Sequence, residues 1–368
     1  MSREQGFPDP GTPTAYAVSP DSGEHWTAEG AWEVSPGIHR IPLPLPMDGL
    51  KAINVYVITT DDGLVLIDGG WSIQVARDLL DRCLRDLGAG FGDIRRFLVT
   101  HVHRDHYTLA RVLGRELGVD VALGRGEEPA MVALNDLDAL TENPFAALLR
   151  TAGAHDLAEL WNRGRGDGDG DGRPDPAWWE LPDSWLEGDH EIPLGARTLD
   201  AVETPGHTPG HFVFADQAAG LLFSGDHVLP TITPSIGFTF PAEPQPLGDF
   251  MASLTKVRAL PDLRVLPAHG PVAPSSHARV DELLAFHDKR LALCLDSLTG
   301  GPRSSADVAG TLGWTRHETP YEKLDEFARG MAAMETKAHL DLLVARGRAT
   351  RQTDADSVVW YAAVSGQQ

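Results

Sequence analysis

Short apolar runs, each followed at once by histidine or aspartate, are the feature that most constrains the fold of this chain. One run leads into the segment from Thr100 to His106, and three later runs lead into His207, Asp226 and His269. Apolar runs of this length, bounded by turn signals, are typical of strands buried on both faces. Four predicted strand ends therefore deliver residue types that bind metal ions.

The segments before this set alternate between strand and helix patterns. The apolar runs at 53–58 and 64–67 flank the turn from Asp61 to Gly63 and predict a hairpin of buried strands. Apolar residues then recur at helical spacing from Ala76 to Leu87, and the run from Phe97 to Thr100 predicts another strand. The pattern predicts a mixed α/β fold.

A long insertion interrupts this pattern. One hundred residues separate His106 from His207, far more than one helix and one strand need. We place a helical insertion at about 124–190, with helices expected near 128–140, 144–152 and 155–162.

Three regions are predicted along the chain: a flexible, Pro/Gly-rich N-terminal arm at 1–30, a catalytic domain at 31–276 and a C-terminal domain at 277–368. In the last region, helices are expected near 277–298, 304–312 and 331–346, followed by two strands. Three helices followed by a β-hairpin are the order of a winged helix, so we expect a winged-helix-like C-terminal domain.

The charge balance disfavours nucleic acid as a partner. The chain carries 31 basic and 53 acidic side chains, a net charge of −22 that repels polyanions. The third helix expected in the C-terminal domain offers few cations, chiefly Lys337 and Arg346, for phosphate binding. We expect this domain to close over the active site or to form a homo-oligomer instead.

The sequence indicates a cytoplasmic protein without a membrane partner. No stretch approaches the roughly 18 apolar residues of a membrane helix, and the N-terminus lacks the apolar core of a secretory signal. Cys83 and Cys294 fit no zinc or redox spacing and are expected to be buried apolar residues.

The residue types at the strand ends indicate two metal ions. Residues two apart in extended chain point the same way, so His101 and His103 can share one ion, while Asp105 and His106, beyond the turn, can serve a second. Imidazole and carboxylate without thiolate suit Zn²⁺, with Fe or Mn as alternatives. A single His-X-His is usually incidental, whereas a set of seven such residues after strands is not. The full set is His101, His103, Asp105, His106, His207, Asp226 and His269.

These motifs resemble the metallo-β-lactamase superfamily, whose His-X-His-X-Asp-His signature is matched from His101 to His106. The resemblance extends from about Trp32 to Ser275 and implies an αββα sandwich. It implies one metal held by His101, His103 and His207, and another held by Asp105, His106 and His269. It further implies that Asp226 bridges the two metals and that Asp68, in LVLIDGG, supports the ligands.

Two subgroups of that superfamily are similar in the GDHVLP segment and in the C-terminal region: the glyoxalase-type hydrolases and the β-lactamase-like endoribonucleases. The chain departs from the usual pattern at Thr108, where a glycine often stands, and in the long span before His207. Both departures bear on the shape of the pocket.

Ligand chemistry predicts a mechanism. Two cations lower the pKa of a shared water from about 15.7 toward about 7, and the resulting metal-bridging hydroxide is the nucleophile. Asp105 and Asp226 are the expected catalytic residues, and Asp105 could also orient the hydroxide. No separate side chain is identified as a general acid, so leaving groups that depart as anions are favoured.

Weaker signals surround this set. His211 is expected to hydrogen-bond to the ligand loops or to contact substrate, and Tyr107, Phe238 and Phe240 are candidates for the substrate pocket. The tryptophans of the insertion either line that pocket or pack the insertion against the core: Trp161, Trp178, Trp179 and Trp185. The segment from Asp167 to Gly172 resembles a calcium loop without its closing Glu, because Trp178 holds that position.

The leading functional hypothesis is a dinuclear metallohydrolase for a small ester, thioester or lactone. The alternatives are a phosphodiesterase or endoribonuclease, which the net charge opposes, a mononuclear iron persulfide dioxygenase with the same ligands, and an antibiotic-degrading β-lactamase. A non-catalytic DNA-binding regulator would leave the seven ligands without a purpose.

Overall fold

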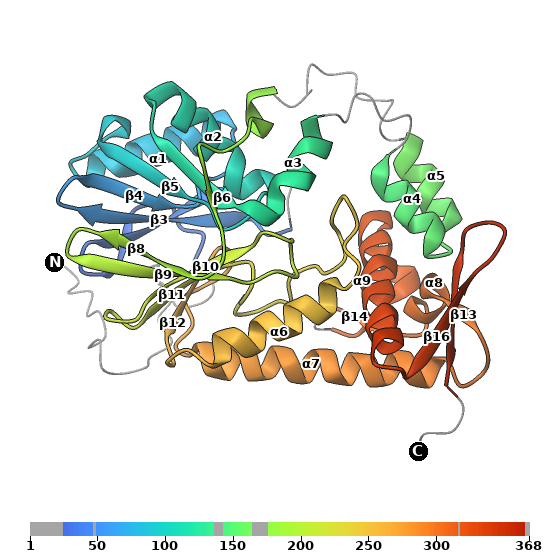
Figure 1. The fold of residues 1–368 in the computed structure, drawn as a ribbon. Helices are drawn as coiled ribbons and strands as arrows, with labels where there is room; N and C mark the ends of the chain where they lie inside the picture. Colours follow the sequence, from blue (N-terminus) through green and yellow to red (C-terminus); the bar gives the residue numbers. More distant parts are fainter. Residues whose placement is uncertain (1–24, 47–48, 136–142, 164–175, 316, 365–368) are drawn as a thin grey trace.

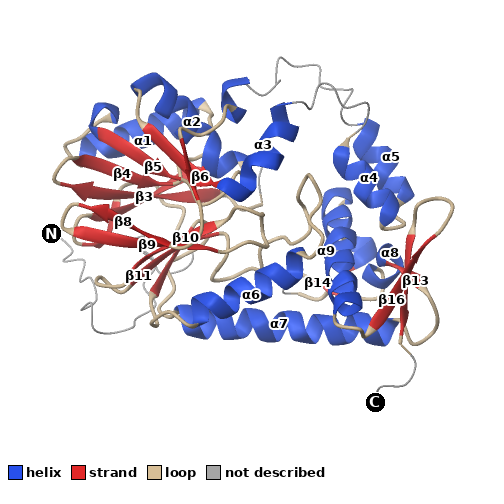
Figure 2. Ribbon diagram, in the orientation of Figure 1, coloured by secondary structure: helices blue, strands red, loops and turns tan. Residues whose placement is uncertain are grey.

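Two β-sheets packed face to face form the centre of the molecule, and helices cover their outer faces in the computed structural model (Figure 1, Figure 2). The structure describes residues 25–46, 49–135, 143–163, 176–315 and 317–364. The calcium-like loop and most of the expected N-terminal arm lie outside these residues. The αββα fold class is confirmed.

The first sheet has seven strands in the order of the sequence. Its strands β1 to β4 pair antiparallel, and β4 to β7 pair parallel. The strands are β1 (Trp32–Ser35), β2 (Ile38–Pro44), β3 (Ala52–Thr60), β4 (Gly63–Ile67), β5 (Ile94–Leu98), β6 (Asp120–Gly124) and β7 (Ser184–Leu186).

The second sheet has the order β12-β11-β10-β9-β8. Its strands pair antiparallel except for β11 and β12, which are parallel. The strands are β8 (His190–Leu194), β9 (Arg197–Glu203), β10 (Phe212–Asp216), β11 (Leu221–Gly225) and β12 (Arg264–Pro267).

Alternating side chains of β3 show why this strand is apolar throughout. Val55 and Val57 pack toward the helices that cover the first sheet, whereas Tyr56 and Ile58 pack between the two sheets. Because successive side chains of a strand point to opposite faces, a strand buried on both sides needs an unbroken apolar run. The expected hairpin of buried strands is confirmed by the pairing of β3 with β4.

Helices α1 (Gln74–Asp86), α2 (Arg104–Leu117) and α3 (Glu128–Asn135) lie on the side of the first sheet, and α6 (Pro246–Arg258) and α7 (Ser276–Ser297) lie on the side of the second (Figure 1). The helical spacing noted between residues 76 and 87 forms the buried face of α1. Cys83 lies on that face, and both cysteines are buried and free.

The C-terminal region contains α8 (Ser305–Ala309), α9 (Glu326–Ala345) and a three-stranded sheet of β13 (Arg303–Ser304), β17 (Val359–Ala363) and β16 (Ala349–Thr353). A short pair, β14 (Gly313–Trp314) and β15 (Thr319–Pro320), precedes α9. The helices and the β16–β17 hairpin follow the expected order, and the winged-helix assignment itself stays a prediction. Helix α9 begins before the expected residue 331 because the side chain of Asp325 caps it, accepting from the Ala328 N–H at 2.7 Å.

The C-terminal region shares its core with the second sheet. One apolar cluster contains Val213 and Leu222 of that sheet together with Leu291 of α7 and Leu340 of α9. The domain boundary expected at 276/277 stays a prediction, but removal of the region would expose this cluster to water. Burial of each such side chain contributes about 1.5–3 kcal/mol.

The insertion contacts the C-terminal region through α4 (Pro144–Thr151) and α5 (His155–Arg163), which pack beside α9 (Figure 1). The indole of Trp161 lies directly on the α9 backbone at Gly330, where a Cβ atom would stand 2.5 Å from Trp161 Cζ2. Glycine at this position therefore permits the close packing of the two segments. No helix among the described residues is both long and apolar enough to cross a membrane.

Candidate metal centre

Strand direction brings the expected ligands to one edge of the sandwich. In the second sheet, β9, β11 and β12 run the same way, so His207, Asp226 and His269 all follow strands that end at that edge. In the first sheet, β4 and β5 are parallel and lead into Asp68 and His101. Helix α2 begins at the next turn and carries Asp105 and His106 in its first turn.

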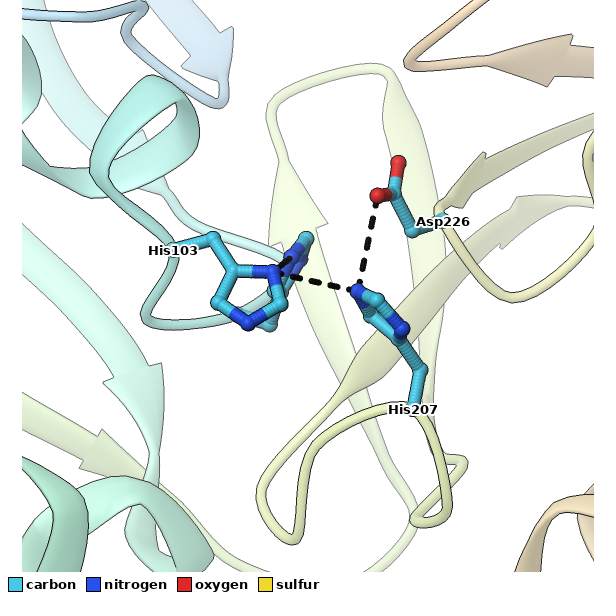
Figure 3. A group of neighbouring side chains, drawn as sticks. His103, His207 and Asp226 are labelled. Carbon is cyan, nitrogen blue, oxygen red and sulfur yellow. Dashed lines mark hydrogen bonds and ion pairs between the residues drawn. The ribbon is translucent and has the colours of Figure 1, made fainter. Parts of the chain in front are cut away.

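A first group of four candidate ligands consists of His101, His103, His207 and Asp226. Figure 3 shows three of them, His103, His207 and Asp226. His103 Nδ1 lies 2.9 Å from His101 Nε2 and 3.1 Å from His207 Nε2. His207 Nε2 in turn lies 3.5 Å from Asp226 Oδ2. Nitrogen and oxygen atoms from three separate loops therefore converge on one point.

A second group consists of Asp105, His106 and His269. Asp105 Oδ2 lies 3.4 Å from His269 Nε2 and 3.7 Å from His106 Nε2. Asp226 faces this group as well, because its Oδ1 lies 3.4 Å from His269 Nε2 and 3.7 Å from His106 Nε2. The carboxylate of Asp226 thus presents one oxygen to each group, the arrangement that a bridging ligand needs.

Backbone carbonyls fix the tautomers of two of these histidines. His207 Nδ1 donates to the Ser235 carbonyl and His269 Nδ1 donates to the Ala52 carbonyl, each at 2.8 Å. A carbonyl can only accept, so each Nδ1 carries the proton and each Nε2 keeps its lone pair. Both Nε2 lone pairs are available to a metal ion.

Asp68 supports the site from behind. Its carboxylate accepts from His106 Nδ1 at 2.9 Å, and from the Thr100 N–H at 2.8 Å and the Thr100 hydroxyl. Asp68 adopts a left-handed backbone conformation with φ 61°. The bond to His106 turns its Nε2 toward the second group. Strand β5 ends at Leu98, two residues before the expected end, because the Thr100 N–H bonds to the Asp68 side chain and not to a neighbouring strand.

His211 lies behind the loop that carries Asp226. Its Nε2 accepts from the Asp226 N–H at 3.2 Å, so Nδ1 holds the proton and donates to the Thr204 hydroxyl at 2.9 Å. Gly225, with φ 50°, allows this approach, because a Cβ there would lie 2.7 Å from His211 Nε2. His211 therefore contacts the ligand loop rather than the pocket described below.

The donor set fits divalent cations. Three buried atoms that face one another have no hydrogen-bond partner among the described residues: His106 Nε2, His269 Nε2 and Asp226 Oδ1. Acceptors that are desolvated together are costly unless a cation neutralises them. Burial alone would lower the pKa of His106, but Asp68 and the neighbouring carboxylates raise it to about 10, which shows the negative potential at this point. The side chains named above would hold the metal ions.

An apolar pocket of about 430 Å³ opens beside His103. Phe238 and Phe240, the candidates for a substrate pocket, are among its lining residues. Its further lining residues are Val102, Glu127, Ala130, Leu134, Asn143, Pro144, Phe145, Thr208, Pro209, Thr239 and Pro241.

Tyr107 does not line this pocket, contrary to expectation. Its ring lies in the core under the first sheet, and its hydroxyl donates to the Glu180 carbonyl at 2.6 Å. The reason is helical geometry, because the residue after His106 on α2 points about 100° away from the metal centre.

The tryptophans of the insertion also pack elsewhere. Trp179 and Trp185 contact the core of the first sheet, and Trp178 packs edge to face on Trp71. Trp161 stacks on Phe327 of α9 and contacts Phe145 and Phe238 from outside the pocket. Packing of the insertion is therefore their role in the structure.

The sequence interpretation missed Glu127, Phe145 and Thr239, which line the pocket. A signal for Glu127 exists in the sequence, because this carboxylate follows the apolar run of β6 as the ligands follow their strands. Strand β6 is parallel to β5, so its end lies at the same edge of the sheet.

Comparisons with known proteins agree with this geometry. The family model of the metallo-beta-lactamase superfamily matches residues 48–269. A metallo-beta-lactamase family protein from Thermus thermophilus superposes with a TM-score of 0.70 at 25% identity, covering 90% of this chain and 100% of that one.

Two curated relatives with descriptive names are similar to this chain. Lactamase-like protein nscB from Neosartorya fischeri is 25% identical over 77% of this chain and 66% of its own length. An atrochrysone carboxyl ACP thioesterase, AgnL7, from Paecilomyces divaricatus is 34% identical over 31% of this chain and 33% of its own length. The matches thus span less than two thirds of either relative.

Proposed function

The chain belongs to the metallo-β-lactamase superfamily, and we propose that it is a dinuclear metal-dependent hydrolase of small thioesters, esters or lactones. The observation that carries the proposal is the pair of ligand groups joined by the two oxygens of Asp226. Zn²⁺ is the ion that the histidine and carboxylate donors suit best, with Fe and Mn as alternatives.

Bound divalent ions would lower the pKa of a coordinated water toward about 7 and polarise the acyl oxygen of the substrate. The protein supplies the geometry for this chemistry. Asp226 holds the two ligand groups together, Asp105 places a further carboxylate at the second group, and the carbonyl-bound His207 and His269 keep their lone pairs directed inward. Asp105 and Asp226 are the residues to which we assign direct roles in catalysis.

The surroundings of the site support an acyl substrate. The pocket beside His103 is lined mainly by apolar side chains, which suit an acyl group better than a phosphate chain. The net charge of −22 disfavours RNA. A thiolate or stabilised alkoxide leaves without a strong proton donor, and one relative is named a thioesterase.

The test combines metal analysis with a substrate panel. We expect two metal ions per chain and a kcat/KM for thioesters or lactones at least about tenfold above that for single-stranded RNA or bis-aryl phosphodiesters, a difference of roughly 1.4 kcal/mol. Better turnover of RNA, abolished in Asp226→Ala, would favour an endoribonuclease. One iron per chain and oxygen consumption with a persulfide would favour a dioxygenase.

A further inference from the structure

The pocket beside the metal centre contains two polar atoms without partners. Glu127 Oε2 and Thr239 Oγ1 are buried and have no hydrogen-bond partner in the described part of the chain. Glu127 is fully buried and Thr239 is 7% exposed. Both residues line the pocket, whose other walls are largely apolar.

The two oxygens of Glu127 have different surroundings. Oε1 accepts from the Thr208 hydroxyl, on the loop that carries His207. Oε2 has no hydrogen-bond partner among the described residues, and hydrogen bonding from the backbone N–H groups of Val102 and Gly210 lowers the pKa of the carboxyl group. Oε1 is thus bonded to the loop that carries His207, and Oε2 is the oxygen that lacks a partner among the described residues.

A buried polar group without a hydrogen-bond partner is disfavoured unless a ligand or water satisfies it. Burial raises the pKa of Glu127 to about 7, against the Thr208 hydrogen bond that lowers it. The carboxyl group can therefore accept or donate a hydrogen bond near neutral pH.

The apolar walls indicate what kind of group enters. Phe145 and Phe238 stack with ring centroids 4.2 Å apart, and Phe240 and three prolines complete the lining. Such surfaces suit a ring system better than a charged or highly solvated group. His103 belongs to the same lining, so a group bound there is adjacent to the metal centre.

We propose that this pocket selects acyl groups that carry a ring with a hydroxyl substituent. Glu127 recognises the hydroxyl group through a hydrogen bond, and Thr239 assists it. This inference rests on the proposed acyl hydrolase function and names the substrate class within it. Glu127 is a specificity-determining residue, and the metal ligands perform the chemistry.

The first experiment measures binding without turnover. Binding of 2-naphthol and of 2-methoxynaphthalene, which lacks the hydroxyl proton, is followed by fluorescence in the metal-loaded full-length protein. We expect wild type to prefer 2-naphthol by at least about tenfold, and Glu127→Gln to lose most of that preference. Glutamine keeps an oxygen for Thr208 but turns an NH₂ group toward the ligand.

The second experiment measures selectivity in turnover. The substrates are N-acetylcysteamine thioesters of 2-naphthoic acid and of its ring-hydroxylated isomers. We expect Glu127→Gln to reduce the kcat/KM ratio of the preferred hydroxylated isomer to the parent by about tenfold, mostly through KM. Thr239→Val, of nearly the same shape, should reduce the ratio less.

Matched controls separate a binding role from a structural one. Glu128→Gln removes the same charge one residue away, where Glu128 pairs with Arg125 at the surface, and should leave both ratios at the wild-type value. Thr208→Val removes the loop contact and leaves the carboxyl group in the pocket. If Thr208→Val alters metal content while Glu127→Gln changes neither ratio, Glu127 only supports the loop and the proposal is wrong.

The outcomes also separate this inference from the proposed function. Glu127-dependent binding of 2-naphthol with no hydrolysis of any ester, thioester or lactone would overturn the proposed function and keep the pocket assignment. The opposite outcome is hydrolysis of thioesters together with equal binding of 2-naphthol and 2-methoxynaphthalene in wild type and in Thr239→Val. That outcome would overturn the pocket assignment and keep the proposed function.

Discussion

Buried histidines gather at the candidate metal centre and also between α7 and α9. In the second cluster, His339 Nδ1 donates to the Glu335 carbonyl at 2.8 Å, so its Nε2 accepts from His287 Nδ1 at 3.2 Å. Arg290, whose guanidinium carbon lies 3.9 Å from the centre of the Trp314 ring, is a positively charged neighbour of both histidines, and the buried carboxyl group of Glu335 lies near it. At the metal centre the neighbours are Asp105 and Asp226.

The sign of the neighbouring charge separates the two clusters. Carboxylates beside imidazoles create a site for cations, whereas a guanidinium beside imidazoles repels them. Burial, with the Arg290 charge, lowers the pKa of His339 to about 4, so this pair stays neutral. A count of buried histidines therefore does not identify a metal site, but the charge of their neighbours does.

The largest expected difference between the clusters is in activity. Asp226→Ala should reduce turnover by roughly 1,000-fold or more and lower the metal content, because it removes the ligand shared by both groups. His339→Leu should leave metal content and kcat near wild type. Steady-state kinetics and elemental analysis test both variants, and retained two-metal loading in Asp226→Ala would contradict the bridging role.

Metal removal should distinguish the clusters by stability. A ligand at about 1,000 times its Kd stabilises the folded state by roughly 4 kcal/mol, so chelation should lower the melting temperature markedly. Chelation should lower the melting temperatures of wild type and His339→Leu by the same amount, and that of Asp226→Ala by little. Differential scanning calorimetry with and without chelator measures this, and equal losses in all three proteins would argue against the assignment.

The histidine pair should matter for stability alone. His339→Leu leaves the His287 N–H without an acceptor, at a cost of about 1–3 kcal/mol in unfolding free energy. The double variant with His287→Leu should cost less than the sum of the single variants, since it removes both partners. Urea unfolding of the three proteins checks this, and strict additivity would show that the hydrogen bond contributes nothing.

An effect confined to one pH window concerns a buried carboxyl group that has neither metal nor histidine partners. The folded-state pKa of Glu127, about 7, exceeds its ordinary value of 4.5. The folded state therefore holds a proton that the unfolded state releases, and stability falls as pH rises from about 4.5 to 7. The free energy of unfolding of wild type, compared with that of Glu127→Gln, should fall by up to about 1.4 kcal/mol per pH unit in this window. Urea unfolding at several pH values measures the slope, and parallel curves would contradict a raised pKa.

Local pattern was sufficient to predict the strands that lead into the candidate ligands and to gather those ligands, but it did not predict β1, β2, β6, β7 or β8. The strands of the ligand-bearing edge are rich in apolar residues, although β5 and β9 also contain charged ones, and the candidate ligands follow soon after these strands, so neither inference needed distant contacts. The prediction succeeded for His101 and His103 because extended backbone alone places them on the same side.

Contacts between distant segments could not be predicted in this way. The packing of Trp161 on Gly330 joins residues from the insertion and the last long helix, and no local pattern encodes it. The burial of Glu127 depends on the Thr208 loop, which is equally remote in sequence. Tyr107 was misplaced because adjacency to His106 in sequence is not adjacency in space on a helix.

The contact between α9 and the insertion has a consequence for the order in which the enzyme is completed during synthesis. All seven candidate ligands precede residue 270, but Phe238, which lines the pocket, packs against Phe327 at the start of α9. At about 5–20 residues per second, a ribosome needs several further seconds to add that helix. The nascent chain thus carries every candidate ligand before the helix that packs against Phe238 has been made.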